Sequence, residues 1–122
     1  MAPESRAFPR PLRLTRGTDL ERVRHEGKRV RTASLDVRAT ASLHALSRVG
    51  FVVPKYKHSG VARNLVKRRL RELVRLRMLG LLQEHPPLDV VVRVFPSAYD
   101  RDFAVLGAEL EQAIRQLLKR VG

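Results

Sequence analysis

A dense cluster of basic residues lies in the middle of the chain. Between Arg63 and Arg77 there is one acid, Glu72, among seven basic residues: Arg63, Lys67, Arg68, Arg69, Arg71, Arg75 and Arg77. In an α-helix, successive residues are about 100° apart around the axis, so Val66, Leu70 and Leu73 share one side. The sector roughly opposite them, which we call the cationic face, holds Asn64, Lys67, Arg68, Arg71 and Arg75. Such a helix buries its apolar side and offers its cations to the phosphates of a nucleic acid.

The alternative for the cationic face is an ordinary solvated surface, relieved by counterions and by a pair between Arg68 and Glu72. One acid cannot neutralise seven bases, and cations four residues apart, such as Lys67 and Arg71, repel each other. A phosphate backbone would remove this repulsion, so the pattern favours a polyanionic partner.

A loop of mixed chemistry precedes the basic segment, with Lys55, Tyr56, Lys57 and His58 followed by Ser59 and Gly60. Its cations suit a phosphate backbone, and its rings suit stacking on an unpaired base. The residue types alone fit an exposed turn equally well. Adjacency to the cationic face favours nucleic-acid contact.

No constellation for hydrolysis is visible in the sequence. A protein nuclease needs clustered carboxylates for Mg²⁺ or a pair of histidines for acid and base work. The histidines, His25, His44, His58 and His85, are scattered. Asp36 and Asp89 fall at or in predicted strands, where a turn cap or a surface pair is expected. We therefore predict no catalytic residue, and no metal or cofactor held by the protein alone.

Composition agrees with a nucleic-acid-binding protein. The 122 residues suit a single domain, and 25 Lys and Arg against 12 Asp and Glu give a net charge of +13. An anionic membrane is the rival polyanion, but no apolar run approaches the roughly 20 residues that span a bilayer. Residues 1–11 lack the apolar centre of a signal peptide. We expect a soluble cytoplasmic protein, and the absence of cysteine excludes thiol chemistry.

The N-terminal residues divide into an arm and the start of the fold. Residues 1–17 are basic and proline-rich and are predicted to be a flexible arm, with a single domain over 18–122. Thr18 and Glu21 fit a capping box for a short helix over Asp19–Glu26, and Gly27 fits a left-handed stop.

The remaining pattern is typical of an α+β fold. Four segments are predicted to be strands, from alternation or β-branched content: 28–32, 35–41, 48–53 and 89–95. The apolar run of the last predicts burial on both faces and a central place in the sheet. A long amphipathic helix is predicted over 61–82, with Ala62, Val66, Leu70, Leu73 and Arg77 on its inner face. A packing helix is predicted over 102–119.

The segment Ala62–Glu72 resembles the signature of the bacterial ribonuclease P protein component. That pattern is Arg-Asn, two residues, Lys-Arg, two residues and Arg-Glu, and Arg63-Asn64, Lys67-Arg68 and Arg71-Glu72 match every fixed position. The likeness extends along the chain through Arg13-Leu14, the strand run from Arg48 and Pro54-Lys55 to the last helix.

The resemblance implies an α-β-β-β-α-β-α sandwich with a left-handed crossover around the basic helix. It also implies the noncatalytic subunit of an RNA-based endoribonuclease that removes the 5′ leader of precursor tRNA. The implied partners are the catalytic RNA and precursor tRNA, without membrane or DNA. Mg²⁺ would be held mainly by the RNA.

The resemblance further implies two RNA-binding surfaces. The catalytic RNA would contact Lys55, Arg63, Asn64, Lys67, Arg68 and Arg71, with Tyr56, Lys57, His58 and Arg75 as further candidates. The single-stranded leader would contact Leu20, Arg24, Arg31 and Arg38. Family members commonly carry aromatics at the positions of Leu20 and Arg24 and a lysine at that of Tyr56, so this chain departs from the pattern there.

Two other function classes fit part of the sequence. Composition alone favours a ribosomal or RNA-chaperone protein, and only the Arg-Asn/Lys-Arg/Arg-Glu string separates this class from a ribonuclease P subunit. A DNA-binding helix module would predict a helix-turn-helix pair or a dimer seam, and the strands that flank the basic helix argue against both.

Overall fold

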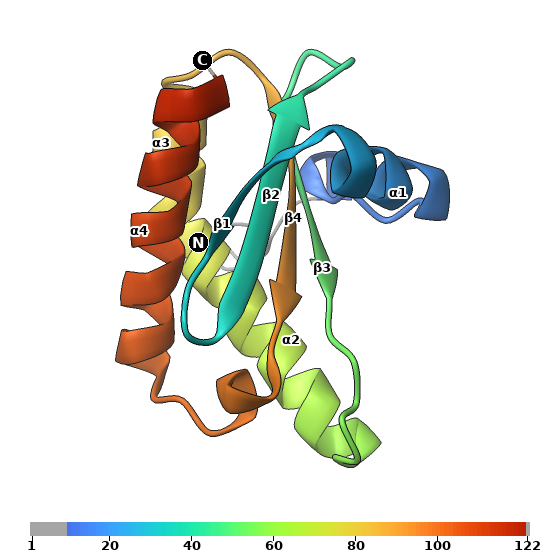
Figure 1. Cartoon of the computed structure of the whole chain (residues 1–122), viewed down its shortest axis with the longest axis vertical. Coiled ribbons are helices and arrows are strands. Elements are labelled where there is room, and N and C mark those ends of the chain that lie inside the picture. The colour runs from blue at the N-terminus through green and yellow to red at the C-terminus, as the bar shows by residue number, and fades with distance from the viewer. Residues whose placement is uncertain (1–9, 122) are drawn as a thin grey trace, which may run out of the picture.

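The computed structural model describes residues 10–121 and contains one four-stranded sheet with helices on both faces (Figure 1). The elements in chain order are a 3₁₀ turn η2 (Arg10–Leu12), α1 (Gly17–Glu26), β1 (Lys28–Arg31), β2 (Leu35–Ala41), β3 (Arg48–Val52), α2 (Gly60–Leu73), a π-helical turn η3 (Val74–Met78), α3 (Leu79–Gln83), β4 (Leu88–Val94), a 3₁₀ turn η4 (Pro96–Tyr99) and α4 (Phe103–Val121). This order confirms the predicted α+β fold class.

The strand order is β1-β2-β4-β3, with β3 parallel to β4 and the other pairs antiparallel. The central place predicted for β4 is confirmed, and all its residues are buried except Arg93. Figure 1 shows β3 and β4 both pointing down, with β3 on the right and α2 behind the sheet. The crossover from β3 through α2 to β4 is therefore left-handed.

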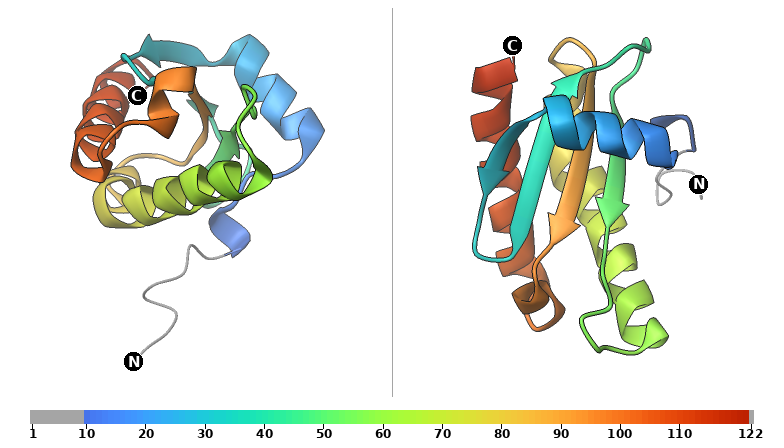
Figure 2. Two further views of the ribbon diagram at one scale, coloured as in Figure 1. Left: turned by 90° about the horizontal axis from the view of Figure 1, so that it is seen from below. Right: turned by 45° about the vertical axis from the view of Figure 1, so that its right-hand side comes forward.

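Helices cover the two faces of the sheet unequally. α2 and α4 pack on one face over the main core, which includes Val37, Val92, Leu70 and Leu110. α1 crosses the strands on the opposite face (Figure 2), where Val23 packs with Leu14 and Val91 in a smaller cluster. Because α1 covers only part of that face, side chains of β1, β2 and β4 remain accessible beside it.

The long helix predicted over 61–82 is present, with one irregularity. α2, η3 and α3 form a continuous run, and η3 is a single π-helical turn that inserts an extra residue. Val74, Met78 and Leu82 then continue the buried side begun by Leu70. Arg77, predicted on the inner face, is rotated to its border and lies 3.8 Å from Glu111.

The predicted caps of α1 are wrong. The helix begins at Gly17, before Thr18, and Arg16 occupies the cap position without a side-chain hydrogen bond. Gly27 is extended at φ −76° instead of left-handed. Its missing side chain serves close packing, because a Cβ there would lie 2.5 Å from the Val23 carbonyl oxygen.

Part of the predicted arm lies on the sheet. Residues 1–9 are outside the described residues, but η2 is ordered, Arg13 bridges Val49 and Leu14 is buried. The Leu14 amide donates to the Val49 carbonyl at 2.9 Å. The folded part of the chain thus includes residues ahead of Thr18.

Gly50 is required where this N-terminal segment crosses β3. A Cβ on Gly50 would clash with the Leu14 carbonyl oxygen and approach Leu20 Cδ2 to 2.8 Å. We expect Gly50→Ala to lower the free energy of unfolding by about 3 kcal/mol, because backbone must move. The matched control Gly60→Ala, with no atom within 4 Å of the new methyl, should change it by less than about 0.5 kcal/mol. Chemical denaturation measures both; equal effects would contradict the assignment.

Candidate RNA-binding surfaces

The structure places the cationic face on one side of α2. Ser59 caps the helix, its Oγ accepting from the Ala62 amide at 3.1 Å. Val66, Leu70 and Leu73 point into the core. Asn64, Arg68 and Arg71 are exposed, while Lys67 and Arg75 are half-buried. The helix therefore presents these side chains as the sequence predicted.

Neighbouring groups divide the cations into anchored and accessible ones. Arg63 Nε donates to the Val53 carbonyl at 2.6 Å, which fixes its stem against the end of β3. Glu72 pairs with Arg75, with Nε 3.1 Å from Oε1, and not with Arg68. The hydrogen bond from Arg75 holds the pKa of Glu72 below its usual value. Within residues 10–121 no ion pair engages Arg68 or Arg71, so both are available to phosphate.

A groove of about 180 Å³ runs beside the cationic face. Lys67 and Arg71 line it together with Arg13 and Phe51. Burial lowers the pKa of Lys67, and the nearby Arg63 and Arg71 guanidinium groups lower it further. An anion bound in this groove would stabilise the charged form of Lys67.

The lowered pKa of Lys67 predicts pH-dependent RNA binding. Bound phosphate would raise this pKa, so complex formation takes up a proton at alkaline pH. Affinity should fall as pH rises through the pKa of the free protein. Calorimetry in buffers of different ionisation enthalpy measures the uptake. Lys67→Arg should retain affinity and lose this uptake; unchanged uptake in that variant would assign it to another group.

The loop before α2 uses its rings internally. Tyr56 and Lys57 have φ of 47° and 71°, unusual for non-glycine residues. The Tyr56 hydroxyl donates to the Val94 carbonyl at 3.0 Å, and the His58 ring stacks on Tyr99 with centroids 3.9 Å apart. These contacts hold a strained loop whose two lysines, Lys55 and Lys57, are exposed.

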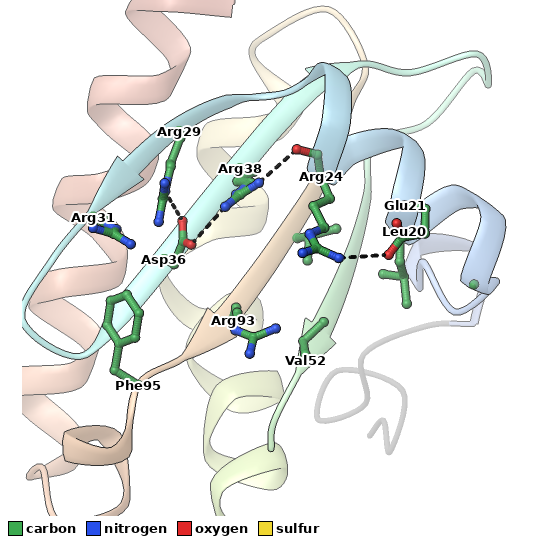
Figure 3. Close-up of a pocket in the computed structure, with 12 residues that line it drawn as sticks. Leu20, Glu21, Arg24, Arg29, Arg31, Asp36, Arg38, Val52, Arg93 and Phe95 are labelled. Carbon is green, nitrogen blue, oxygen red and sulfur yellow. Dashed lines mark hydrogen bonds and ion pairs between the residues drawn. The ribbon is translucent and has the colours of Figure 1, made fainter. Parts of the chain in front are cut away.

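The second candidate surface is a cleft of about 590 Å³ on the open sheet face beside α1 (Figure 3). The residues predicted to contact the leader, Leu20, Arg24, Arg31 and Arg38, all line it. They come from α1, β1 and β2, so the fold brings together residues that are dispersed in the sequence.

Three further residues of the cleft were missed by the sequence analysis: Arg29, Arg93 and Phe95. The apolar run over 89–95 predicts burial on both faces, whereas its polar position, Arg93, is exposed and lines the cleft. Val91, Arg93 and Phe95 alternate with Val90, Val92 and Val94, and only the latter set lies in the main core. This alternation is the sequence signal that could have placed Arg93 and Phe95 on the cleft side of the strand.

The cleft carries an excess of positive charge. Five arginines and two acids line it. Asp36 accepts from Arg29 at 3.1 Å and from Arg38 at 3.3 Å, while Arg24 lies 3.4 Å from Glu21. Arg38 also donates to the Arg24 carbonyl at 2.8 Å, tying β2 to the end of α1.

The groove and the cleft adjoin each other. Leu20 lines both, from α1, with Phe51 on the groove side and Val52 on the cleft side of the edge strand β3. Leu20 is therefore the residue that the groove and the cleft have in common.

Two of the four histidines are held by structural contacts. Within residues 10–121 no group of three His, Cys, Asp or Glu side chains could hold a metal ion. His25 lies 3.3 Å from Glu21, and His58 stacks on Tyr99. No helix of this part of the chain is long and apolar enough to cross a membrane.

The surroundings of Asp89 differ from those predicted. Instead of capping a turn or forming a surface pair, its side chain is fully buried within β4 and ion-paired with both Arg22 and Arg48. Arg48 Nε lies 3.1 Å from Asp89 Oδ1, and this hydrogen bond raises the pKa of Arg48. Arg48 also reaches Asp19 at 3.5 Å, so the network joins α1 to β3 and β4.

Comparisons with known proteins agree with one family. The family model described as Ribonuclease P matches residues 8–120. The ribonuclease P protein component of Streptomyces griseus is 38% identical, with 91% of this chain and 95% of that protein covered. That of Clavibacter michiganensis is 32% identical, with 89% and 95% covered.

Solved structures share the fold. The ribonuclease P protein of Staphylococcus aureus superposes with a TM-score of 0.73 at 22% identity, over 88% of this chain and 97% of that one. The Thermotoga maritima protein gives 0.70 at 26% identity, over 90% and 97%. With the Arg-Asn/Lys-Arg/Arg-Glu string on the cationic face, these matches show that the chain belongs to the bacterial ribonuclease P protein component family.

Proposed function

We propose that this chain, a protein subunit of the ribonucleoprotein that matures the 5′ end of tRNA, binds its two RNA partners on two adjoining surfaces. The cationic face, with Lys55 and Arg63, contacts the catalytic RNA. The cleft holds the single-stranded 5′ leader of precursor tRNA. The observation that carries the proposal is the junction at Leu20, where the groove beside the cationic face meets the cleft.

The role of the protein in this proposal is binding and electrostatic screening. Its cations lower the repulsion among the backbones of catalytic RNA, leader and tRNA. Mg²⁺ ions held mainly by the RNA would activate the attacking water, and no side chain of the protein takes part in the chemical step. Membership of the family makes the ribonuclease P RNA the partner.

Charge reversals on the two surfaces test this division of labour. Arg68→Glu should weaken assembly with the catalytic RNA. Arg24→Glu should leave assembly nearly unchanged but weaken binding of precursor tRNA to the holoenzyme by about tenfold, without affecting tRNA that lacks a leader. Both substitute exposed helix positions. Equal effects of Arg24→Glu on substrates with and without a leader would contradict the cleft assignment.

A further inference from the structure

We infer that Phe95, with Arg31 and Arg93, forms a nucleobase-binding site at the β4 end of the cleft, where one unpaired base of the leader stacks on the ring. The inference rests on the proposed leader-binding role of the cleft and adds the position and chemistry of one contact within it. None of these three residues belongs to the Arg-Asn/Lys-Arg/Arg-Glu string.

The ring of Phe95 is held in place at the edge of the cleft. Phe95 directly follows β4, and its amide donates to the Ser34 carbonyl at 2.8 Å, which fixes the backbone against the β1–β2 turn. The side chain is half-buried and lines the cleft. Figure 3 shows the ring beside the hollow, with Arg31 above it and Arg93 next to it.

The contact between Arg31 and Phe95 is loose enough to admit a base. The guanidinium carbon lies 5.7 Å from the ring centroid, near the outer limit of a cation–π contact. Arg31 is exposed and on a flexible stem, so it can turn aside to a phosphate when a base takes the face of the ring. Base stacking on an aromatic ring is the stronger of the two interactions.

Arg93 supplies a cation that the protein itself leaves unused. It lies opposite Asp36 in the β2–β4 register, yet Asp36 already accepts from Arg29 and Arg38. Among the described residues no ion pair engages Arg93, and it is the one exposed residue of β4. A ring flanked by two cations matches a nucleotide, whose base and phosphate need different partners.

The cleft offers a base one position at which it can stack on an aromatic ring. Of the residues that line the cleft, Phe95 alone is aromatic, and the α1 wall offers Leu20 and Arg24. A base that stacks here must be unpaired, because the faces of bases inside a duplex are covered by their neighbours. The site therefore recognises single-stranded RNA at one defined nucleotide.

The test uses the reconstituted holoenzyme and compares wild type, Phe95→Leu and Phe95→Tyr. Each is titrated with precursor tRNA, with tRNA lacking a leader, and with precursor tRNA carrying an abasic nucleotide at each leader position in turn. Phe95→Leu should weaken binding of precursor tRNA about tenfold. Phe95→Tyr should restore it. Assembly with the catalytic RNA and binding of leaderless tRNA should be unchanged in both variants, which excludes misfolding.

The abasic series separates stacking from a structural role. One abasic position should weaken wild-type binding about as much as Phe95→Leu does, and should cause no further loss in that variant. Two results would overturn the base site: losses in affinity from the abasic position and from Phe95→Leu that add, or no loss of affinity in Phe95→Leu. If wild type still binds substrates with a leader more tightly, the proposed leader-binding role of the cleft is unaffected by either result. Equal wild-type affinity with and without a leader would overturn the proposed function itself.

Discussion

Reversing Arg68 and Arg71 to glutamate together is expected to weaken binding of the ribonuclease P RNA by at least about 3 kcal/mol, more than a hundredfold. Both side chains are exposed on the cationic face, and no ion pair within residues 10–121 engages either one. In the proposed complex, each reversal removes a phosphate contact and adds a repulsive charge. The slope of log affinity against log salt should fall by about one per lost contact.

The matched control reverses two basic residues of equal total charge on α4, Arg115 and Lys119. Both are exposed, and α4 carries none of the proposed contacts. The control changes net charge by the same amount, so it measures the loss from long-range attraction alone. Fluorescence titration against the RNA over a salt series gives both quantities. If the two double variants bind alike, the cationic face is not the RNA-binding surface.

Replacing Asp89 by asparagine is expected to destabilise the fold strongly. The carboxylate is fully buried between Arg22 and Arg48, whose side chains are 19% and 14% exposed. Removing one partner of a buried ion pair leaves the others without compensation, at a cost of about 3 kcal/mol. The melting temperature should fall by about 10 °C. Asp100→Asn, the same charge change at an exposed site, should leave it nearly unaltered.

The Asp89→Asn variant also tests whether Asp89 takes part in the cleavage reaction or only stabilises the fold. Because Asp89 is inaccessible to RNA, the single-turnover cleavage rate of a saturated Asp89→Asn holoenzyme should equal that of wild type below its melting temperature. Calorimetry and single-turnover kinetics give the two quantities. A normal melting temperature with a collapsed rate would place Asp89 in the reaction and contradict its structural role.

Local pattern was sufficient to predict most elements. The alternation of Leu35, Val37 and Ala39 defines β2, whose observed limits are those predicted, and the apolar run from Val90 gave β4 its central place. The cationic face followed from spacing alone, because side-chain direction on a helix depends on position along the chain.

The features that were missed depend on contacts between distant segments. α1 begins at Gly17, next to a segment that packs over Gly50, and no capping pattern reports such packing. Arg22 and Asp89 are 67 residues apart, so their ion pair becomes visible only when α1 lies on β4. The apolar run that ends at Phe95 predicts a strand buried on both faces, but α1 covers only part of the second face and leaves Phe95 in the cleft.

We propose that the protein acts by binding, without a catalytic group of its own. The most direct measurement is 5′ cleavage of a precursor tRNA at low Mg²⁺ and moderate salt, by a bacterial ribonuclease P RNA with the protein, by the RNA alone and by the protein alone. We predict that the protein stimulates cleavage only when the RNA is present. Cleavage by the protein alone, or tight RNA binding without stimulation, would contradict the account.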